Sequence, residues 1–116
     1  MRISQQKLNP SLKKEIKRTL VLALSDFKGE KEVDLFLADF LTDSEFESFA
    51  KRLAIAYWLK KGRSYENIRK NLRVSSATIA NVQSMMDKDG FKLALKKIEA
   101  EEWASAWAQK IQKVLK

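Results

Sequence analysis

Cysteine and histidine are both absent from this chain of 116 residues. Their absence excludes disulfide frameworks, zinc sites built on Cys or His, thiol nucleophiles and imidazole bases. Any catalysis or metal binding would have to rest on carboxylates or hydroxyls alone. We therefore predict that the protein is not an enzyme and has no catalytic residues, metal ligands or cofactor.

Long apolar runs are missing as well. No stretch approaches the roughly 20 apolar residues that a membrane span requires. The first residues, MRISQQKLNPSLKKEIKR, lack the apolar centre and the cleavage site of a secretory signal. We expect a soluble, cytoplasmic protein that does not associate with a membrane.

Glycine and proline are scarce, with three and one residues respectively, and apolar residues recur at spacings of three and four. This pattern predicts an all-α protein without strands. The expected parts are a basic N-terminal helix over residues 1–29, a helical core over 30–87 and a long C-terminal helix over 88–116. We expect the three to pack as one compact domain.

Capping residues mark where the helices begin and end. Asn9 and Pro10 are typical of an N-cap followed by a first-turn proline, and the helix they begin is expected to run to Gly29. Thr42 is expected to cap a further helix that ends at Gly62. That helix is apolar around more than one face, which predicts burial both by its own chain and by a second subunit.

The positive charge of the chain is concentrated in two segments. The formal net charge is +8, and residues 1–25 carry six positive charges and one negative. Residues 51–73 carry eight positive and one negative, whereas residues 74–86 carry none. The chain is therefore expected to bind an anionic partner, and residues 51–86 are the first candidate region.

The string RSYENIRKNLRVSSATIANVQSMM, residues 63–86, has the layout of a helix-turn-helix at residues 64–86. Ser64 and Ser75 each precede a short helical pattern, and Arg73 and Val74 form the break between the two. Five apolar residues fall at the positions that must point inward for the two helices to brace each other: Ile68, Leu72, Val74, Ile79 and Val82.

The outer face of the second helix is the predicted base-reading surface. It carries Ser76, Ala77, Ala80, Asn81 and Ser84. Asn81 can pair bidentately with adenine, and the alanines can contact a thymine methyl. Phosphate and groove-edge contacts are predicted for Arg63, Arg69, Lys70, Arg73, Ser75 and Thr78. The alternative is a plain helical hairpin whose basic residues form a solvated surface.

A family resemblance extends over this region. The stretch LTDSEFESFAKRLAIAYWLKKGRSYENIRKNLRVSSATIANVQSMM resembles the tryptophan repressor superfamily. Within it the chain looks closer to the YerC/YecD-type members, whose sequences also continue into a segment like Gly90, Phe91 and Lys92. The resemblance implies an intertwined helical homodimer that presents two recognition helices to a roughly palindromic operator in double-stranded DNA.

The resemblance also bears on whether a corepressor binds. Leu41, Thr42 and Arg52 stand where the family has matching groups, which implies an effector or anion site at Thr42 and Arg52. Asn81, Val82 and Met85 depart from the pattern, since they replace an arginine, a glycine and a serine of the ligand pocket. We therefore predict that free tryptophan does not bind.

Arg52 has a second interpretation as a surface residue. On a helix it could form an ion pair with Glu47 or Glu45.

The C-terminal helix carries a strong apolar face around Trp103 and Trp107. This face is expected to pack on the same dimer or on the N-terminal helix. The alternative is a docking surface for a protein partner or a higher oligomer.

These observations predict a small dimeric transcriptional regulator, a repressor that occupies its operator through the helix-turn-helix. The alternative from another class is a protein-interaction module with a basic surface for an acidic partner. In that case the helix-turn-helix would serve only as a scaffold.

Overall fold

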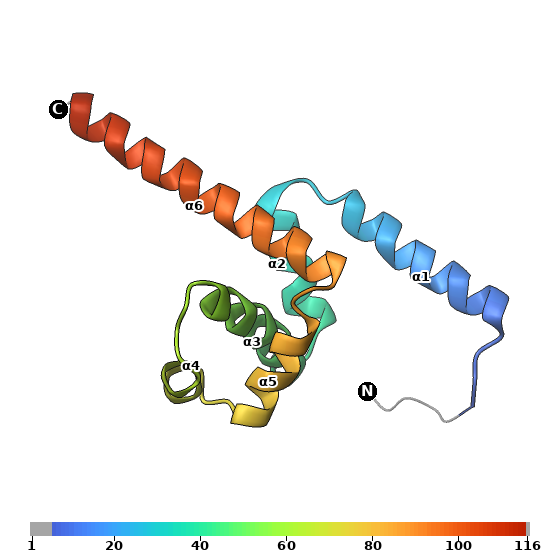
Figure 1. Cartoon of the computed structure of the whole chain (residues 1–116). Coiled ribbons are helices and arrows are strands. Elements are labelled where there is room, and N and C mark those ends of the chain that lie inside the picture. The colour runs from blue at the N-terminus through green and yellow to red at the C-terminus, as the bar shows by residue number, and fades with distance from the viewer. Residues whose placement is uncertain (1–5, 116) are drawn as a thin grey trace. The chain divides into compact units, whose positions relative to one another are not determined.

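A computed structural model describes residues 6–115, and the side chains of all of these except Trp107 and residues 111–115. The described residues form six helices and no strand, as the spacing predicted (Figure 1). The helices are α1 (Pro10–Ser25), α2 (Gly29–Phe40), α3 (Asp43–Lys60), α4 (Tyr65–Leu72), α5 (Ser76–Met85) and α6 (Asp89–Leu115). The chain divides into two compact units, residues 1–46 and residues 47–116. The expected division at residues 29 and 87 stays a prediction.

In the first unit, α1 exposes its apolar side. Its N-terminus is capped as expected, because the Asn9 side chain accepts a hydrogen bond of 2.8 Å from the Ser11 N–H and Pro10 is the first helical residue. Leu12, Ile16 and Leu20 are nevertheless between 44% and 50% exposed. Neither α1 nor α2 contains a buried residue. These helices therefore carry more apolar surface than the first unit by itself covers.

The first helix ends earlier than expected. It was predicted to continue to Gly29, but α1 stops at Ser25 and Gly29 is the first residue of α2. Gly29 adopts a φ of +74°, which glycine tolerates and which turns the chain into the next helix. Phe27 therefore belongs to the connection, where its ring lies 5.0 Å from that of Phe36.

The start of α3 is a reciprocal cap at the boundary of the first unit. The Glu45 N–H donates to the Thr42 hydroxyl at 3.1 Å, and the Thr42 N–H donates to the Glu45 carboxylate at 2.9 Å. The backbone N–H of Thr42, and after it the Thr42 side chain, lower the pKa of the Glu45 carboxyl. Thr42 is thus the N-cap that the sequence predicted.

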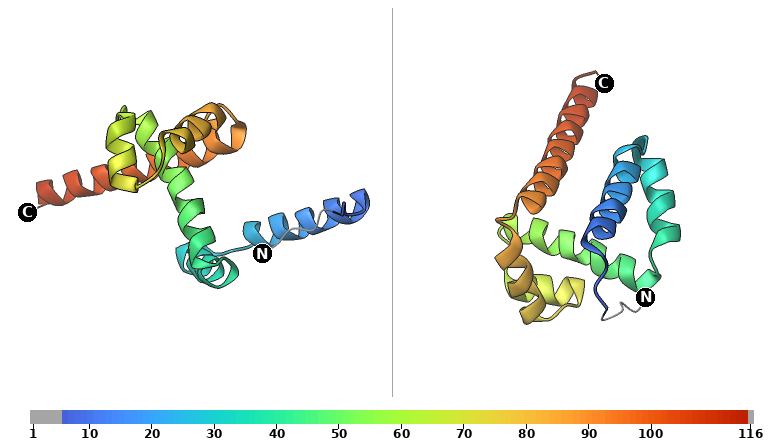
Figure 2. Two further views of the ribbon diagram at one scale, coloured as in Figure 1. Left: turned by 90° about the horizontal axis from the view of Figure 1, so that it is seen from below. Right: turned by 90° about the vertical axis from the view of Figure 1, so that its right-hand side faces the viewer.

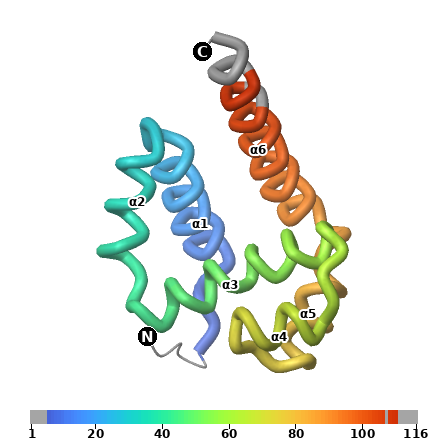
Figure 3. Tube along the Cα trace, turned by 90° about the vertical axis from the view of Figure 1, so that its left-hand side faces the viewer, coloured from blue at the N-terminus to red at the C-terminus, as the bar shows by residue number. Residues whose placement is uncertain are grey.

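The core of the second unit gathers side chains from α3, α4, α5 and α6. Its buried residues are Ile55, Ala56, Ile68, Ile79, Val82 and Leu95. Each fully buried isoleucine contributes roughly 1.5–3 kcal/mol relative to an exposed one. This shared core holds the two short helices α4 and α5 against the longer α3 and α6 (Figure 3).

The helix α6 extends away from this core (Figures 1 and 2). Two ion pairs join it to the end of α3, Lys60 to Glu99 at 2.9 Å and Lys61 to Glu102 at 3.2 Å. Trp103 is 66% exposed, and the side chain of Trp107 lies outside the described residues. Among the residues that the structure describes, no helix combines the length and the hydropathy needed to cross a membrane.

Candidate nucleic-acid interface

Two serine caps delimit the pair of short helices. The Ser64 hydroxyl accepts a hydrogen bond of 3.1 Å from the Asn67 N–H, and the Ser75 hydroxyl accepts one of 3.1 Å from the Thr78 N–H. Between them, Arg73 ends α4 in the left-handed conformation with a φ of 54°. Both caps and the position of the break were predicted from the sequence and are confirmed.

The inner faces of α4 and α5 meet as the apolar spacing predicted. Ile68, Ile79 and Val82 are at most 2% exposed, and Leu72 and Val74 pack half-buried against them. All five predicted inward positions therefore contribute to one apolar contact. The two helices follow one another across a short turn, in the order of a helix-turn-helix (Figure 2).

The outer face of α5 is uncharged and open to solvent. Its five predicted base-reading residues, Ser76, Ala77, Ala80, Asn81 and Ser84, are all exposed. The Ser84 hydroxyl donates to the Asn81 carbonyl at 2.6 Å, so its proton is already used within the helix. Ser84 can consequently act on an external group only as an acceptor, whereas the side-chain amide of Asn81 has no hydrogen bond among the described residues.

The hydroxyls at the start of α5 are occupied by capping. The Ser75 and Thr78 hydroxyl oxygens lie 2.9 Å apart, in addition to the bond from the Thr78 N–H to Ser75. Both side chains remain exposed. One of the two hydroxyl protons is used between the oxygens, so the pair can present the other proton, together with the partial positive charge of the helix N-terminus, to an anion.

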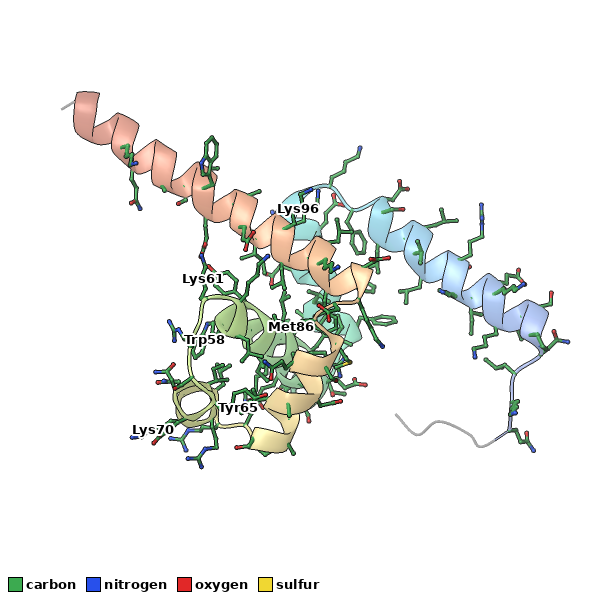
Figure 4. All side chains as sticks on the ribbon, viewed as in Figure 1. Trp58, Lys61, Tyr65, Lys70, Met86 and Lys96 are labelled. Carbon is green, nitrogen blue, oxygen red and sulfur yellow. The ribbon has the colours of Figure 1, made fainter. Side chains whose placement is uncertain are left out.

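The structure divides the eight basic residues between 51 and 73 into two groups. Four have partners: Lys51 pairs with Glu47, Lys60 with Glu99, Lys61 with Glu102, and Arg63 lies over the Trp58 ring at 3.9 Å. The other four, Arg52, Arg69, Lys70 and Arg73, have no ion pair among the described residues. Lys70 points away from the body of the second unit (Figure 4). Three of these four unpaired cations lie on α4 or directly after it.

A cleft of about 430 Å³ separates α3 from the N-terminal half of α5. It is lined by, among others, Arg52, Arg73, Ser75, Thr78 and Asn81. The cleft brings the predicted anion-binding residue Arg52 together with three residues predicted to contact phosphate and one predicted to read a base. The sequence had placed these residues on separate elements, and only the fold joins them.

The ion pair proposed for Arg52 does not form. Glu47 pairs with Lys51 at 3.3 Å, and the Glu45 carboxylate accepts from the Thr42 N–H. An i to i+4 pair lies on one helix face, whereas i to i+5 does not, which favours Lys51 over Arg52 as the partner of Glu47. The Thr42 hydroxyl is engaged in the cap of α3, which is the role the structure shows for it.

The three residues that depart from the family's tryptophan pocket differ in their burial. Val82 is buried at 2% exposure and fills part of the core. Asn81 is exposed, and Met85 is half-buried against the same core. The valine side chain therefore occupies space that a glycine would leave open.

Two contacts near the interface were missed by the sequence analysis. The Tyr65 hydroxyl donates to the Gln83 side-chain oxygen, and the Arg63 guanidinium stacks on Trp58. Tyr65 and Gln83 are 18 positions apart on two helices, so no local spacing rule connects them. The Arg63 contact depends on the turn at Gly62, whose φ is +85°.

Residues 16–99 match the profile of the protein family described as Trp repressor protein. The chain is also 31% identical over 88 residues to the uncharacterized protein YerC of Bacillus subtilis. That match covers 74% of this chain and 82% of YerC. No solved structure matches the chain.

Proposed function

Because the chain belongs to the Trp repressor protein family, we propose that it is a transcriptional regulator that binds double-stranded DNA through α4 and α5. It acts as a repressor by occupying its operator. The observation that carries the proposal is the exposed, uncharged face of α5 beside three unpaired cations, Arg69, Lys70 and Arg73. Base reading is thereby assigned to α5, and attraction of the phosphates to α4 and the turn that follows it.

Base readout is the task of α5. A major groove admits one helix, and the buried contacts of Ile79 and Val82 hold the inner face of α5 so that its outer face is free to enter. Asn81 presents a side-chain amide that matches the N6 and N7 edge of adenine. Ala77 and Ala80 offer small apolar surfaces for thymine methyl groups.

Phosphate attachment is the task of α4 and the turns around it. Arg69, Lys70 and Arg73 can neutralise phosphates without breaking an ion pair, whereas Lys60 and Lys61 would first have to leave their glutamates. Arg63 is held by Trp58 and by a hydrogen bond of 3.5 Å to Asn67. Its guanidinium edge is thus pre-oriented for a further acceptor.

A homodimer is supported by the apolar surface that the two units, each taken by itself, leave uncovered. Leu12, Ile16 and Leu20 of α1 and Phe40 of α2 are between 44% and 63% exposed, and on α3 Phe49 is 56% exposed. Exposed apolar surface of this extent is typical of an interface between subunits. A two-fold dimer would present two copies of α5 to half-sites about 34–36 Å apart.

Tryptophan is not the effector in this proposal, because Val82 fills part of the space beside α5. Isothermal titration calorimetry should detect no saturable binding of free tryptophan. Micromolar binding would contradict this point and leave the DNA proposal unaffected.

The experiment that tests the proposed function is a selection of bound sequences from random duplex DNA. A palindromic consensus with half-sites about one helical turn apart would support it. Recovery of no consensus, with binding lost at moderate salt, would favour the protein-interaction module instead.

A further inference from the structure

One hydrogen bond ties together the far ends of α4 and α5. The hydroxyl of Tyr65, in the first turn of α4, donates to the side-chain oxygen of Gln83, near the end of α5. Among the described residues this is the one side-chain hydrogen bond that joins the two helices. Tyr65 lies on the side of α4 that faces α5 (Figure 4).

The apolar contact between α4 and α5 does not by itself fix the angle between the two helices. Ile68, Ile79 and Val82 hold the inner faces together, but apolar contacts are not directional. Apolar packing favours certain crossing angles, but among different helix pairs these angles scatter by about 15–20°. A hydrogen bond requires both a short distance and a narrow angle. A bond between the far ends therefore restricts the angle at which α5 leaves α4.

We propose that Tyr65 and Gln83 are positioning residues that hold the outer face of α5 in register with the cations of α4. The inference rests on the proposed function, in which α5 reads bases and α4 binds phosphates. It adds two residues that neither contact DNA themselves nor belong to the buried core. The Tyr65–Gln83 bond affects how well the protein distinguishes its consensus DNA sequence from other sequences. It leaves the strength of phosphate binding unchanged.

Fold stability and sequence discrimination depend on the pair to different degrees. Tyr65 is half-buried and Gln83 is exposed, so water can replace the bond if it breaks, and the folded state loses little. Bidentate base contacts tolerate little misalignment, because each needs two hydrogen bonds at once. Phosphate contacts by long basic side chains adapt to a shifted helix.

The test removes the Tyr65 hydroxyl and measures two affinities. The probes are the consensus duplex from the selection and a scrambled duplex of equal length and composition. Tyr65→Phe should weaken consensus binding roughly 3- to 10-fold, the size of one net hydrogen bond, and leave scrambled binding and the salt slope unchanged. Its thermal midpoint should fall by no more than about 8 °C, the shift to which one net hydrogen bond corresponds in a chain of this size.

The matched control is Tyr57→Phe on α3. It deletes the same hydroxyl from a tyrosine that has no side-chain hydrogen bond among the described residues and lies under Lys61 instead. This variant should bind both duplexes as the wild type does. An equal loss of consensus binding in the control would overturn the inference.

A double-mutant cycle separates positioning from direct contact. Gln83→Met should reproduce the loss seen in Tyr65→Phe, and the double variant should be no worse than either single variant. If Gln83→Met weakens binding further in the Tyr65→Phe background, Gln83 contacts DNA and the positioning role is wrong. Unchanged discrimination in Tyr65→Phe, or an equal loss on both duplexes, would also refute it.

These results are distinct from a failure of the proposed function. If the wild-type protein itself does not distinguish the two duplexes, the DNA-reading function fails and the inference fails with it. If the wild type discriminates and Tyr65→Phe discriminates equally well, the inference alone fails.

Discussion

Replacing Arg73 by glycine should make the protein more stable and a weaker DNA binder. Arg73 ends α4 with a φ of 54°, and a left-handed backbone costs an L-residue about 1–2 kcal/mol. Glycine adopts this conformation freely but loses about 0.5–1 kcal/mol more on folding. The two ranges leave a net gain of about 0–1.5 kcal/mol, centred near 0.75 kcal/mol. For a chain of this size we expect a rise of roughly 2–5 °C in the thermal midpoint.

The same substitution removes a cation from the proposed interface. The Arg73 side chain is exposed and has no ion pair among the described residues, so its loss breaks no observed contact within the fold. One lost phosphate contact lowers the magnitude of the salt slope by about 0.9. At 0.1 M salt this corresponds to about eightfold weaker binding. Thermal unfolding and fluorescence anisotropy over a range of salt concentrations measure the two effects separately.

Arg73→Ala is the control that separates the backbone from the charge. Alanine meets the same left-handed penalty as arginine, so this variant should bind DNA as weakly as Arg73→Gly without gaining stability. Wild-type binding by Arg73→Gly would refute the role of the guanidinium. A lower thermal midpoint would refute the reasoning about the backbone.

Three further predictions address other parts of the molecule. Asn81→Ala should relax the preference at one base pair by about 1–3 kcal/mol and leave the thermal midpoint unchanged. The preference is measured on a panel of single-base operator variants, and an unchanged preference would exclude Asn81 from base reading. Arg69→Ala and Lys70→Ala should each weaken binding to every duplex and lower the salt slope by about 0.9, and a loss confined to the consensus duplex would contradict phosphate contact. The Thr42 cap lowers the pKa of Glu45 below its ordinary value of 4.5. The ionised carboxylate therefore stabilises the fold above that pH, and this stabilisation is lost as the pH falls through the lowered pKa. Glu45→Gln should therefore be less stable than the wild type near neutral pH and converge with it in acid, as denaturant unfolding at several pH values will show.

The features of the interface that could be predicted from the sequence depend on residues that lie a few positions apart in the chain. Ser64 and Ser75 were identified as caps because a serine hydroxyl reaches an N–H only three residues further along the chain. The inward positions followed from the helical repeat in the same way. Gly29 shows the limit of this reasoning, because a glycine near a helix terminus can end one helix or begin the next.

Pairing among charges was not predictable from spacing alone. Lys60 and Lys61 belong to the same basic block as Arg69 and Lys70, and their sequence context does not distinguish them. In the fold, α6 brings Glu99 and Glu102 to the end of α3, and both lysines are neutralised there. Which cations remain available for a phosphate was therefore decided by two glutamates that lie 39 and 41 residues further along the chain than their lysines.

The sequence by itself determined the all-helical class, the caps, the break at Arg73 and the separation of the basic block from the uncharged recognition helix. Each of these depends on contacts within a few residues, which the order of side chains encodes directly. Only the tertiary structure decided that Tyr65 meets Gln83, that Arg52 and Arg73 line one cleft with Asn81, and that Arg69, Lys70 and Arg73 keep unpaired charges. These contacts join residues far apart in the chain, and they form only once the core around Ile68, Ile79 and Val82 has fixed the crossing of the helices.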